Sequence, residues 1–367
     1  MAQKPLSDEQ CEEALAAFER HGTETAAAIE LGLSRGTFQN RLRSARARSA
    51  GLALSGLSTL RNADGEPVME WEKYTADKER LEELRRAACE AMCATIERIK
   101  PVAPPSTAIA HLLTLYSFFD YHVGMLAWRK EGGEDWDLTI AERTGTDAMS
   151  MLVSGAPPSD TAVVNIGGDF LHFDGLLPIT PTHGHVLDAD SRFGKVVDVS
   201  IRLIRQLVAL ALQKHGRVIL LIMEGNHDLS SSLWLRKMFA CLYEAEPRVS
   251  VHESELPYYA LEWGVNLLGF HHGHLKKNDQ LPALFAAKFR EMWGRCPKVH
   301  IHTGHRHHKE EKDHAGARVT QHPTLAAMDA HAARAGYFTD REITAITYSK
   351  VAGQVASNTV TPEMLAA

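Results

Sequence analysis

VILLIMEGNHD, residues 218–228, decides the fold of this chain, because an apolar run ends just before the polar group Gly225-Asn226-His227-Asp228. AVVNIGGDFLH, residues 162–172, repeats the arrangement around Asp169 and His172. Short apolar runs bounded by glycine are typical of buried strands. Open α/β sheets bind ligands beyond the carboxyl ends of their strands, so we expect the polar residues of both segments to form one site.

From residue 106 onward, apolar runs of strand length alternate with helical segments, which predicts an α/β fold. Strands are expected over Ile109–Phe119, Ala162–Ile166, Val218–Met223, Tyr259–Phe270 and Val299–Thr303, and helices over Val196–Gln213 and Leu233–Tyr243. Three further polar motifs follow expected strands: Asp120-Tyr121-His122, His272-Gly273-His274 and Gly304-His305-Arg306-His307.

The five motifs supply carboxylate, amide and imidazole side chains and no thiolate. A carboxylate such as Asp169 can bridge two cations, and Asn226 offers a neutral carbonyl oxygen. Such ligands suit hard-to-borderline divalent metals, and the set suffices for two ions about 3.5–4 Å apart with room for water and substrate. The candidate ligands are Asp120, His122, Asp169, Asn226, His272, His305 and His307. Phosphate-ester hydrolysis is therefore the first functional hypothesis.

In this order the motifs resemble those of the calcineurin-like metallophosphoesterase superfamily. The resemblance implies a two-sheet α/β/β/α sandwich over residues 106–367. It also implies one metal held by Asp120, His122, Asp169 and His307, and a second held by Asp169, Asn226, His272 and His305. His271 and His274 are neighbours that could replace His272. Mn²⁺ is the ion we expect at both positions, with Fe, Zn and Mg as alternatives.

The same resemblance implies a division of catalytic roles. A hydroxide bridging the metals would attack phosphorus, and His227 would contact the phosphate and protonate the leaving oxygen. Asp228 would orient His227. The Gly-Asp-x-x-His form of the second motif resembles nucleases and phosphodiesterases of the superfamily, in which His172 would lie near the substrate phosphate. The remaining histidines after position 110 are expected mostly in loops or at the surface. Gln321-His322-Pro323-Thr324 is expected as a turn, with closure of one side of the site as the alternative.

Residues 1–48 predict a small all-α domain. Ser7 can cap a first helix that His21-Gly22 ends, a second helix runs from Glu24 to Leu31, and Gly32 can take the positive φ of a turn. The stretch 25–38 resembles the Fis-like helix-turn-helix, and residues 34–48 contain five arginines and no acid. A basic helix after such a turn is typical of a major-groove reader, although a helical hairpin with a solvated basic face or a protein-docking unit would have the same pattern. The residues expected to contact DNA are Arg35, Thr37, Gln39, Asn40, Arg41 and Arg43.

Residues 49–105 are expected to connect the two domains. Ser, Gly and Ala are frequent over 49–66, which predicts a linker, and a helical pattern over 75–100 predicts a connector helix. Within the catalytic domain, segments 124–160 and 173–195 are expected to shape the entrance to the site. The first of them combines Trp128, Arg129, Lys130 and Trp136 with the nearby acids Glu131, Glu134, Asp135 and Asp137, so its composition favours neither nucleic-acid binding nor its absence.

Composition and charge limit how the protein can bind nucleic acid or membranes. The chain has 367 residues, 44% of them hydrophobic, and a net charge of −6, so contact with nucleic acid must come from a local basic patch. The N-terminus has no apolar signal region and no run reaches the length of a membrane span, which predicts a cytoplasmic protein that does not bind membranes. DNA is the expected partner, and palindromic DNA would favour a homodimer.

The leading hypothesis is a two-metal phosphodiester hydrolase acting as a DNA nuclease or DNA-end processing enzyme, because the N-terminal domain would hold the catalytic domain near DNA. This architecture also resembles uncharacterised phage and prophage phosphoesterases. Two alternatives stay open: a small-molecule or cyclic-nucleotide phosphodiesterase or phosphatase with a regulatory helix-turn-helix, and a non-catalytic DNA-binding protein.

Overall fold

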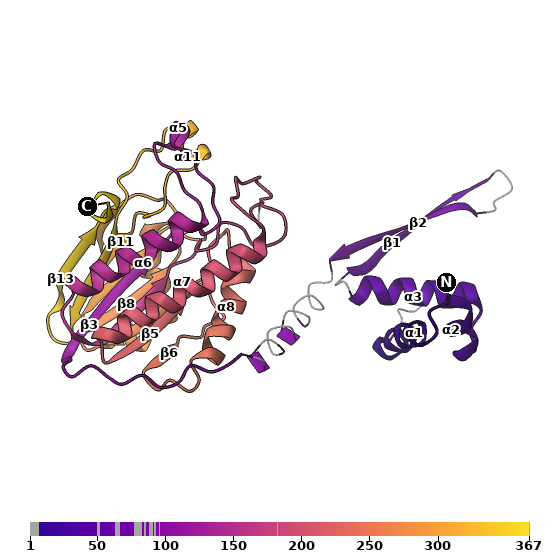
Figure 1. Cartoon of the computed structure of the whole chain (residues 1–367), viewed down its shortest axis with the longest axis horizontal. Helices are drawn as coiled ribbons and strands as arrows, with labels where there is room; N and C mark the ends of the chain where they lie inside the picture. Colours follow the sequence, from indigo (N-terminus) through magenta and orange to yellow (C-terminus); the bar gives the residue numbers. More distant parts are fainter. Residues whose placement is uncertain are drawn as a thin grey trace. The chain divides into compact units, whose positions relative to one another are not determined.

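The computed structural model describes residues 7–49, 52–62, 67–76, 83, 86–87, 91, 93–94, 96–181 and 183–366. The chain divides into two compact units, Met1–Ala94 and Thr95–Ala367 (Figure 1). The second unit therefore begins before residue 106, where the sequence predicts the catalytic domain to begin. Residues 96–105 pack along it, since Ile99 N donates to Leu242 O at 2.9 Å and Arg248 donates to the carbonyls of Val102 and Ala103.

Two sheets form the centre of the second unit. A six-stranded sheet has the order β13-β12-β3-β4-β5-β6. Strands β3 to β6 are parallel to one another, and β12 runs antiparallel to both of its neighbours, β3 and β13. Its strands are β3 (Ile109–Phe118), β4 (Ser159–Ile166), β5 (Arg217–Ile222), β6 (Val249–Val251), β12 (Ile343–Ser349) and β13 (Gly353–Val360). A five-stranded sheet has the order β10-β11-β9-β8-β7, with β8, β9 and β11 parallel. Its strands are β7 (Tyr258–Trp263), β8 (Asn266–His271), β9 (Lys298–Thr303), β10 (Glu310–His314) and β11 (Ala317–Gln321).

The sheets pack face to face through apolar side chains that alternate along their strands. Leu115 and Leu221 from one sheet lie in the same buried cluster as Leu268 and Phe270 from the other. The opposite side chain Leu267 packs toward the helices that cover the outer face. Burial of each of these side chains contributes about 1.5–3 kcal/mol. The two sheets therefore share one continuous core.

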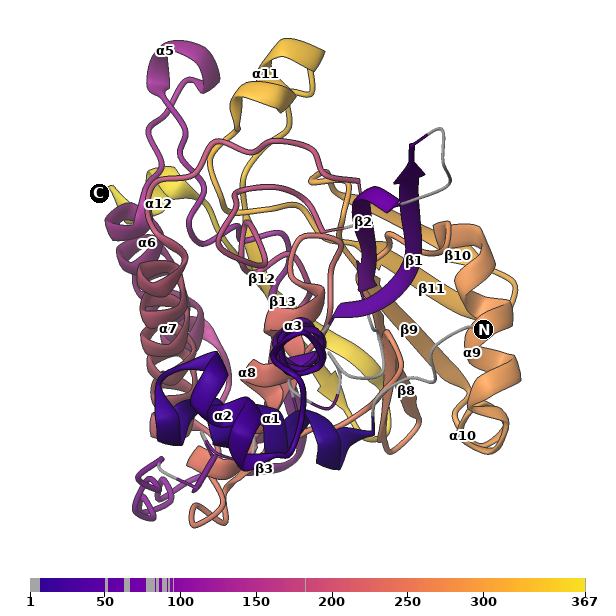
Figure 2. The ribbon, with the colours of Figure 1, turned by 90° about the vertical axis from the view of Figure 1, so that its right-hand side faces the viewer.

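Helices cover both outer faces, which completes an α/β/β/α sandwich (Figure 2). On the six-stranded sheet lie α6 (Leu138–Gly155), α7 (Phe193–Lys214) and α8 (Leu229–Leu242), and on the five-stranded sheet lie α9 (Leu281–Lys288) and α10 (Arg290–Arg295). Val196, Val199, Leu203 and Leu207 recur on one side of α7 and are buried, which is the stripe that fixes a helix on a sheet. The short elements are α5 (Arg129–Gly132), η1 (Asn278–Gln280), α11 (Ala330–Ala335) and α12 (Pro362–Leu365). The expected fold class is confirmed for this unit.

One expected strand is wrong in its extent. Tyr259–Phe270 was expected as a single strand, but Gly264 and Val265 form a turn between β7 and β8, with Trp263 opposite Asn266. Gly264 has a φ of 57°, which a glycine adopts without strain and which ends the extended run. The helix α6 was not expected within segment 124–160; Asp137 begins it by accepting a hydrogen bond from Ile140 N at 2.7 Å.

The first unit begins with the expected three helices, α1 (Asp8–His21), α2 (Glu24–Glu30) and α3 (Arg35–Ser49). Ser7 and Gln10 form a capping box at the start of α1, and Gly22 and Gly32 have φ values of 66° and 64°. Their small core is built around Phe38, which is buried among alanines of α1 and α2. Small alanine side chains allow the helices to approach closely enough to enclose one aromatic ring.

The expected linker over 49–66 is instead part of a hairpin. The antiparallel strands β1 (Leu52–Arg61) and β2 (Pro67–Ala76) occupy this region, with a register shift between Leu54 and Gly56. Frequent serine and glycine masked the alternation of leucines along β1. The connector helix expected over 75–100 falls mostly outside the described residues. Of those described, 83, 86–87, 91 and 93–94 are helical, whereas 75–76 belong to β2 and 96–100 are not helical. No helix in the described part of the chain is long and apolar enough to cross a membrane.

Candidate functional site

The five motifs meet at one end of the sandwich because each follows the carboxyl end of a parallel strand, β3, β4, β5, β8 or β9. Motif side chains from the two sheets come within a few ångströms of one another. His307 Nε2 lies 3.3 Å from Asp120 Oδ1, and His272 Nε2 lies 3.1 Å from Asp169 Oδ2. Residues more than a hundred positions apart in sequence thus form one polar cluster.

The cluster contains two groups that match most of the predicted ligand sets. Asp120, His122 and His307 form one group and Asp169, His272 and His305 the other, with ligand atoms within 4.8 Å of one another in each. His272 Nε2 is also 3.8 Å from Asp120 Oδ1, so the two groups adjoin through their carboxylates. His271 packs away from this junction, with its Nδ1 accepting from Gly273 N at 2.8 Å, which favours His272 as the ligand.

Unpartnered acceptors in the same cluster fit metal ions. Among the described residues, the buried oxygens Asn226 Oδ1 and Asp120 Oδ1 receive no hydrogen bond. Leaving a buried acceptor unpaired costs about 1–3 kcal/mol, and a divalent cation bound to each of these oxygens would remove that cost. Oxygen and imidazole donors without sulfur are also the set that such cations prefer. The residues present therefore fit a pair of divalent metal ions.

The backbone is strained where these ligands lie. In the described ranges, the non-glycine residues with positive φ are Asp120, His122, Asp169, His305 and His307, at 52°, 50°, 49°, 73° and 56°. Each is a predicted ligand. Left-handed backbone costs about 1–3 kcal/mol at a non-glycine residue and concentrates at functional sites, because the surrounding structure must impose it. All five positive-φ positions thus coincide with predicted ligands.

Neighbouring residues impose that backbone. Thr324 Oγ1 donates to the carbonyl of Asp120 at 2.6 Å, and His305 N donates to Asp120 Oδ2 at 2.7 Å. A Cβ on Gly225 would overlap the Asp169 carboxylate, so glycine is required there. Sequence reasoning assigned no role to Thr324 itself, although it lies in the segment for which closure of one side of the site was the alternative to a turn. It also missed Asp174, whose carboxylate accepts from the backbone N–H groups of Ser230 and Ser231 at the start of α8.

The electrostatics of the cluster favour a bound cation. Burial lowers the pKa of His272, but the carboxylates of Asp169 and Asp120 outweigh burial and raise it to about 10. The two carboxylates therefore attract positive charge strongly even without metal. A metal ion bound at Nε2 of His272 would replace a proton there.

His227 and His172 lie beside the first group. His227 Nδ1 donates to the carbonyl of His172 at 2.7 Å, so its Nε2 is the atom available to a substrate. His172 is buried, its Nδ1 lies 3.2 Å from His122 Nδ1, and burial lowers its pKa to about 3. His122, His172 and His227 also place ligand atoms within 4.8 Å of one another. His172 is therefore a neutral ring packed against both His122 and His227, which also contact each other.

The role expected for Asp228 is corrected. Its carboxylate accepts four backbone hydrogen bonds, from Asp169, Phe170, Leu171 and Gly225, at 3.1, 2.8, 3.2 and 2.9 Å. Burial and the neighbouring Asp169 carboxylate raise the pKa of Asp228 to about 7. Asp228 thus joins the loop after β4 to the loop after β5, while a backbone carbonyl orients His227.

Asp228→Asn should lower the free energy of unfolding by about 3 kcal/mol, because the amide group would face backbone donors with a donor of its own. Urea denaturation at pH 7 measures the change. Asp313→Asn is the matched control, since Asp313 is an exposed partner of Arg318 at 2.7 Å and such pairs contribute about 0–1 kcal/mol. Equal losses of unfolding free energy in the two variants would show that the four hydrogen bonds of Asp228 stabilise the protein no more than an exposed ion pair does.

The expectation that the other histidines lie mostly in loops or at the surface is wrong for His271 and His302, which lie in β8 and β9, whereas His215 and His322 lie in loops. His215, His271, His302 and His322 are buried. His302 lies 2.9 Å from His322 Nε2 and 3.0 Å from the Tyr348 hydroxyl, and His322 stacks on Phe119, the residue before Asp120. His302, His322 and Tyr348 thus form a polar network inside the sandwich, whereas His215 contacts Tyr116 and His271 contacts Gly273.

The residues expected to contact DNA lie on α3. Arg35, Thr37, Asn40 and Arg43 are exposed, whereas Gln39 and Arg41 are half-buried. Gln39 Nε2 donates to Glu24 Oε2 at 2.6 Å, so its amide is held within the helical unit. The exposed positions Asn40 and Arg43 are three residues apart, on one side of the helix.

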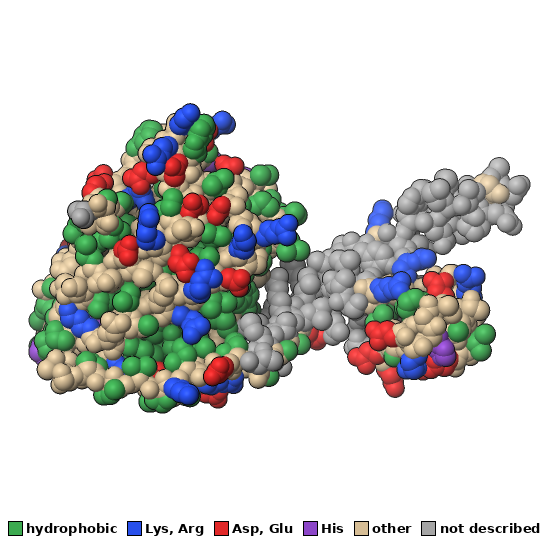
Figure 3. Space-filling model, in the orientation of Figure 1, with side chains coloured by type: hydrophobic (Ala, Val, Ile, Leu, Met, Phe, Trp, Pro, Cys, Tyr) green, Lys and Arg blue, Asp and Glu red, His purple; other side chains and the backbone are tan. Residues whose placement is uncertain are grey.

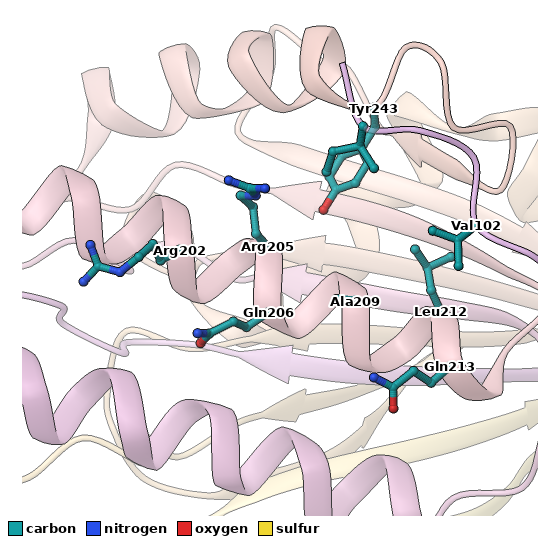
Figure 4. A pocket seen from close by; sticks show the side chains of 9 residues that line it. Val102, Arg202, Arg205, Gln206, Ala209, Leu212, Gln213 and Tyr243 are labelled. Carbon is teal, nitrogen blue, oxygen red and sulfur yellow. The ribbon is translucent and has the colours of Figure 1, made fainter. Parts of the chain in front are cut away.

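A separate hollow of about 520 Å³ lies against α7 in the second unit (Figure 4). Val102, Arg205, Ala209, Leu212 and Tyr243 are among the residues lining it. The lining includes none of the motif residues, so the hollow is distinct from the metal-ligand cluster.

No protein-family model matches the sequence, and no curated protein matches it. Solved structures with a similar arrangement include a conserved uncharacterised protein from Streptococcus pneumoniae TIGR4 described as a predicted phosphoesterase, with 11% identity, a TM-score of 0.28 and coverage of 68% of this chain and 97% of that chain. Vps29 from Entamoeba histolytica complexed with zinc has 13% identity, a TM-score of 0.29 and coverage of 67% and 98%. A novel archaeal phosphodiesterase has 13% identity, a TM-score of 0.35 and coverage of 68% and 99%. The assignment of a two-sheet sandwich with two metal-ligand groups at its strand ends thus rests on this chain's own strands and side chains.

Proposed function

We propose that the second unit is a two-metal-dependent phosphodiester hydrolase, and that DNA is its substrate. The observation that carries the proposal is the pair of adjoining ligand groups around Asp120 and Asp169, together with the unpartnered oxygen of Asn226. Paired metal sites of this kind activate water and neutralise phosphate charge. Mn²⁺ is the proposed ion, because the ligands are oxygen and imidazole.

The protein's own groups would position and protonate the substrate. His227 is held through Nδ1, so Nε2 can contact a phosphate oxygen and donate a proton to the leaving group. His172 packs against the rings of both His122 and His227, at centroid distances of 5.1 and 5.5 Å, while those two rings contact each other at 4.9 Å. Asp228 fixes the two loops that carry Asp169 and Asn226.

DNA is favoured by the charge of the first unit. Residues 34–48, most of α3, carry five arginines and no acid, and Arg35 and Arg43 are exposed. Phosphate contacts of such a helix bind DNA without dependence on sequence, and the tether to the second unit raises the local concentration of the catalytic site. We propose nuclease or DNA-end processing activity on that basis.

Arg43→Ala should weaken DNA binding about tenfold, because it removes a cation from the exposed side of α3. Fluorescence anisotropy with a labelled duplex measures the affinity, and the slope of log affinity against log salt should fall by about one. Arg290→Ala, an exposed arginine of α10, is the control. An unchanged affinity and salt slope in Arg43→Ala would mean that α3 is not the DNA-binding element.

The activity is tested by a cleavage panel of single-stranded, duplex and hairpin DNA, RNA, cyclic nucleotides and bis-p-nitrophenyl phosphate, with Mn²⁺ and with chelator. Asp169→Asn serves as the blank. Metal-dependent cleavage of DNA supports the proposal. Intact DNA beside a rapidly hydrolysed cyclic nucleotide would establish the small-molecule alternative, and no turnover with any divalent ion would establish a non-catalytic DNA-binding protein.

A further inference from the structure

Two short helices, α5 and α11, lie side by side on the second unit (Figure 1). Arg341 joins the two segments that carry them, because its guanidinium pairs with Glu134 after α5 and donates to the carbonyl of Leu325 before α11. The same guanidinium lies over the buried ring of Trp136, 5.6 Å from its centre. The two helices therefore form one structural element.

This element is attached directly to a candidate metal-ligand loop. Thr339 Oγ1 donates to the carbonyl of His307 at 2.9 Å, and Lys309 pairs with Glu342 at 2.7 Å. Thr339 follows Tyr337 and Phe338 in sequence, so these two aromatic residues lie within two positions of a residue bonded to a ligand. The segment that carries them is thereby joined to the loop of His307, and we call α5, α11 and the residues beside them the rim.

The rim exposes aromatic side chains. Trp128, immediately before α5, is 54% exposed, and Tyr337 and Phe338, immediately after α11, are 66% and 72% exposed. Lys130 Nζ lies 5.1 Å from the centre of the Trp128 ring. Large aromatic side chains grouped at the edge of a polar site are typical of a binding surface.

The charges of the rim are largely paired. Arg129 Nε is 2.7 Å from Asp135 Oδ2, and Arg341 is bound to Glu134. Figure 3 shows acidic and basic side chains interspersed at the end of the second unit that carries α5 and α11. Such a surface does not attract a phosphate backbone strongly, whereas exposed rings stack on any flat aromatic ligand.

We propose that Trp128, Tyr337 and Phe338 form a stacking platform that binds an unpaired nucleobase next to the phosphodiester held by the metal-ligand cluster. The inference rests on the proposed function. A base inside a duplex has both faces covered by its neighbours, so only a single strand, a frayed end or a flipped base offers a free face. The platform therefore selects single-stranded or end-frayed DNA over intact duplex.

The test compares the wild type with Trp128→Ala and with the double variant Tyr337→Ala/Phe338→Ala on a single-stranded oligonucleotide. We expect KM to rise roughly tenfold for each ring removed, with kcat less affected. Trp128→Phe should restore most of the affinity because it keeps an aromatic face. Val351→Ala is the matched control: Val351 is 76% exposed, and β12 is antiparallel to β3, which places it at the opposite end of the sheet from Asp120.

An abasic oligonucleotide separates stacking from folding defects. Removal of the bases beside the cleaved bond should weaken the binding of the wild type more than that of Trp128→Ala, because the variant has already lost one of the three stacking contacts, as a double-mutant cycle requires. Equal losses in both proteins would overturn the platform while leaving nuclease activity intact. Loss of a dimer on sedimentation of Trp128→Ala would instead identify the rings as a protein contact and overturn it as well. If the wild type cleaves no nucleic acid but hydrolyses bis-p-nitrophenyl phosphate, the nuclease proposal fails together with the platform.

Discussion

Asp169→Asn should lower phosphodiester turnover at least about a thousandfold, because the loss of several kcal/mol of charge stabilisation in a metal site has that effect. Asp169 is central to the cluster. One oxygen lies 3.1 Å from His272 Nε2, while the other accepts from His227 N at 2.7 Å. Asparagine preserves the shape and tolerates the φ of 49°, so the loop should remain folded. Bound metal should fall from two ions per chain, measured by plasma mass spectrometry after dialysis.

Controls make this result specific. Asp313→Asn changes an exposed carboxylate on β10 and should keep both the metal and the turnover of the wild type. Circular dichroism of both variants checks the fold. Wild-type turnover in Asp169→Asn at saturating Mn²⁺ would falsify the assignment of Asp169 as a metal ligand, and with it the two-metal site.

His227→Ala should retain both metal ions and lose about 10²- to 10⁴-fold in turnover of DNA, the range typical for removal of a general acid. The reason lies in its hydrogen bond. Nδ1 is engaged by the His172 carbonyl, which leaves Nε2 to meet the substrate. Steady-state kinetics and metal analysis on the same preparation measure the two effects separately.

The leaving group distinguishes acid catalysis from metal binding. p-Nitrophenolate departs without a proton, so bis-p-nitrophenyl phosphate should be much less affected by His227→Ala than DNA is. Equal losses on the two substrates, or the loss of one metal ion, would assign His227 to metal binding with His122 and His172. His111→Ala, an exposed histidine of β3, is the control.

The strands of the second unit and the site at their ends could be predicted, because each strand and its polar motif are neighbours in the sequence. Each apolar run ends beside its own polar motif, as in β5 and Asn226, and parallel strands bring those ends together. Asp228 could not be assigned in this way, since three of its four backbone donors lie 57 to 59 residues earlier. Nothing near Asp228 in the sequence indicates which of these partners it meets.

Where both faces of a strand are covered, the alternation of residue types along it does not show which face points between the two sheets. In β9, His300 and His302 alternate with Val299 and Ile301, and the aliphatic residues pack toward α9 while His302 lies inside the sandwich. A prediction that turns aliphatic side chains toward the space between the sheets, and histidines away from it, is therefore wrong for β9. A polar network buried between two sheets can be recognised only after the second sheet is in place.

The left-handed backbone at the five ligand positions restricts how this site can change during evolution. Aspartate, asparagine, histidine and glycine tolerate that conformation better than β-branched residues do. A descendant that lost its metals would therefore accumulate glycine or asparagine at Asp120, His122, Asp169, His305 and His307 before it accumulated valine or isoleucine. Its loops would keep their conformation after metal binding was lost. The residues found at these positions would then indicate that an ancestor had bound metal.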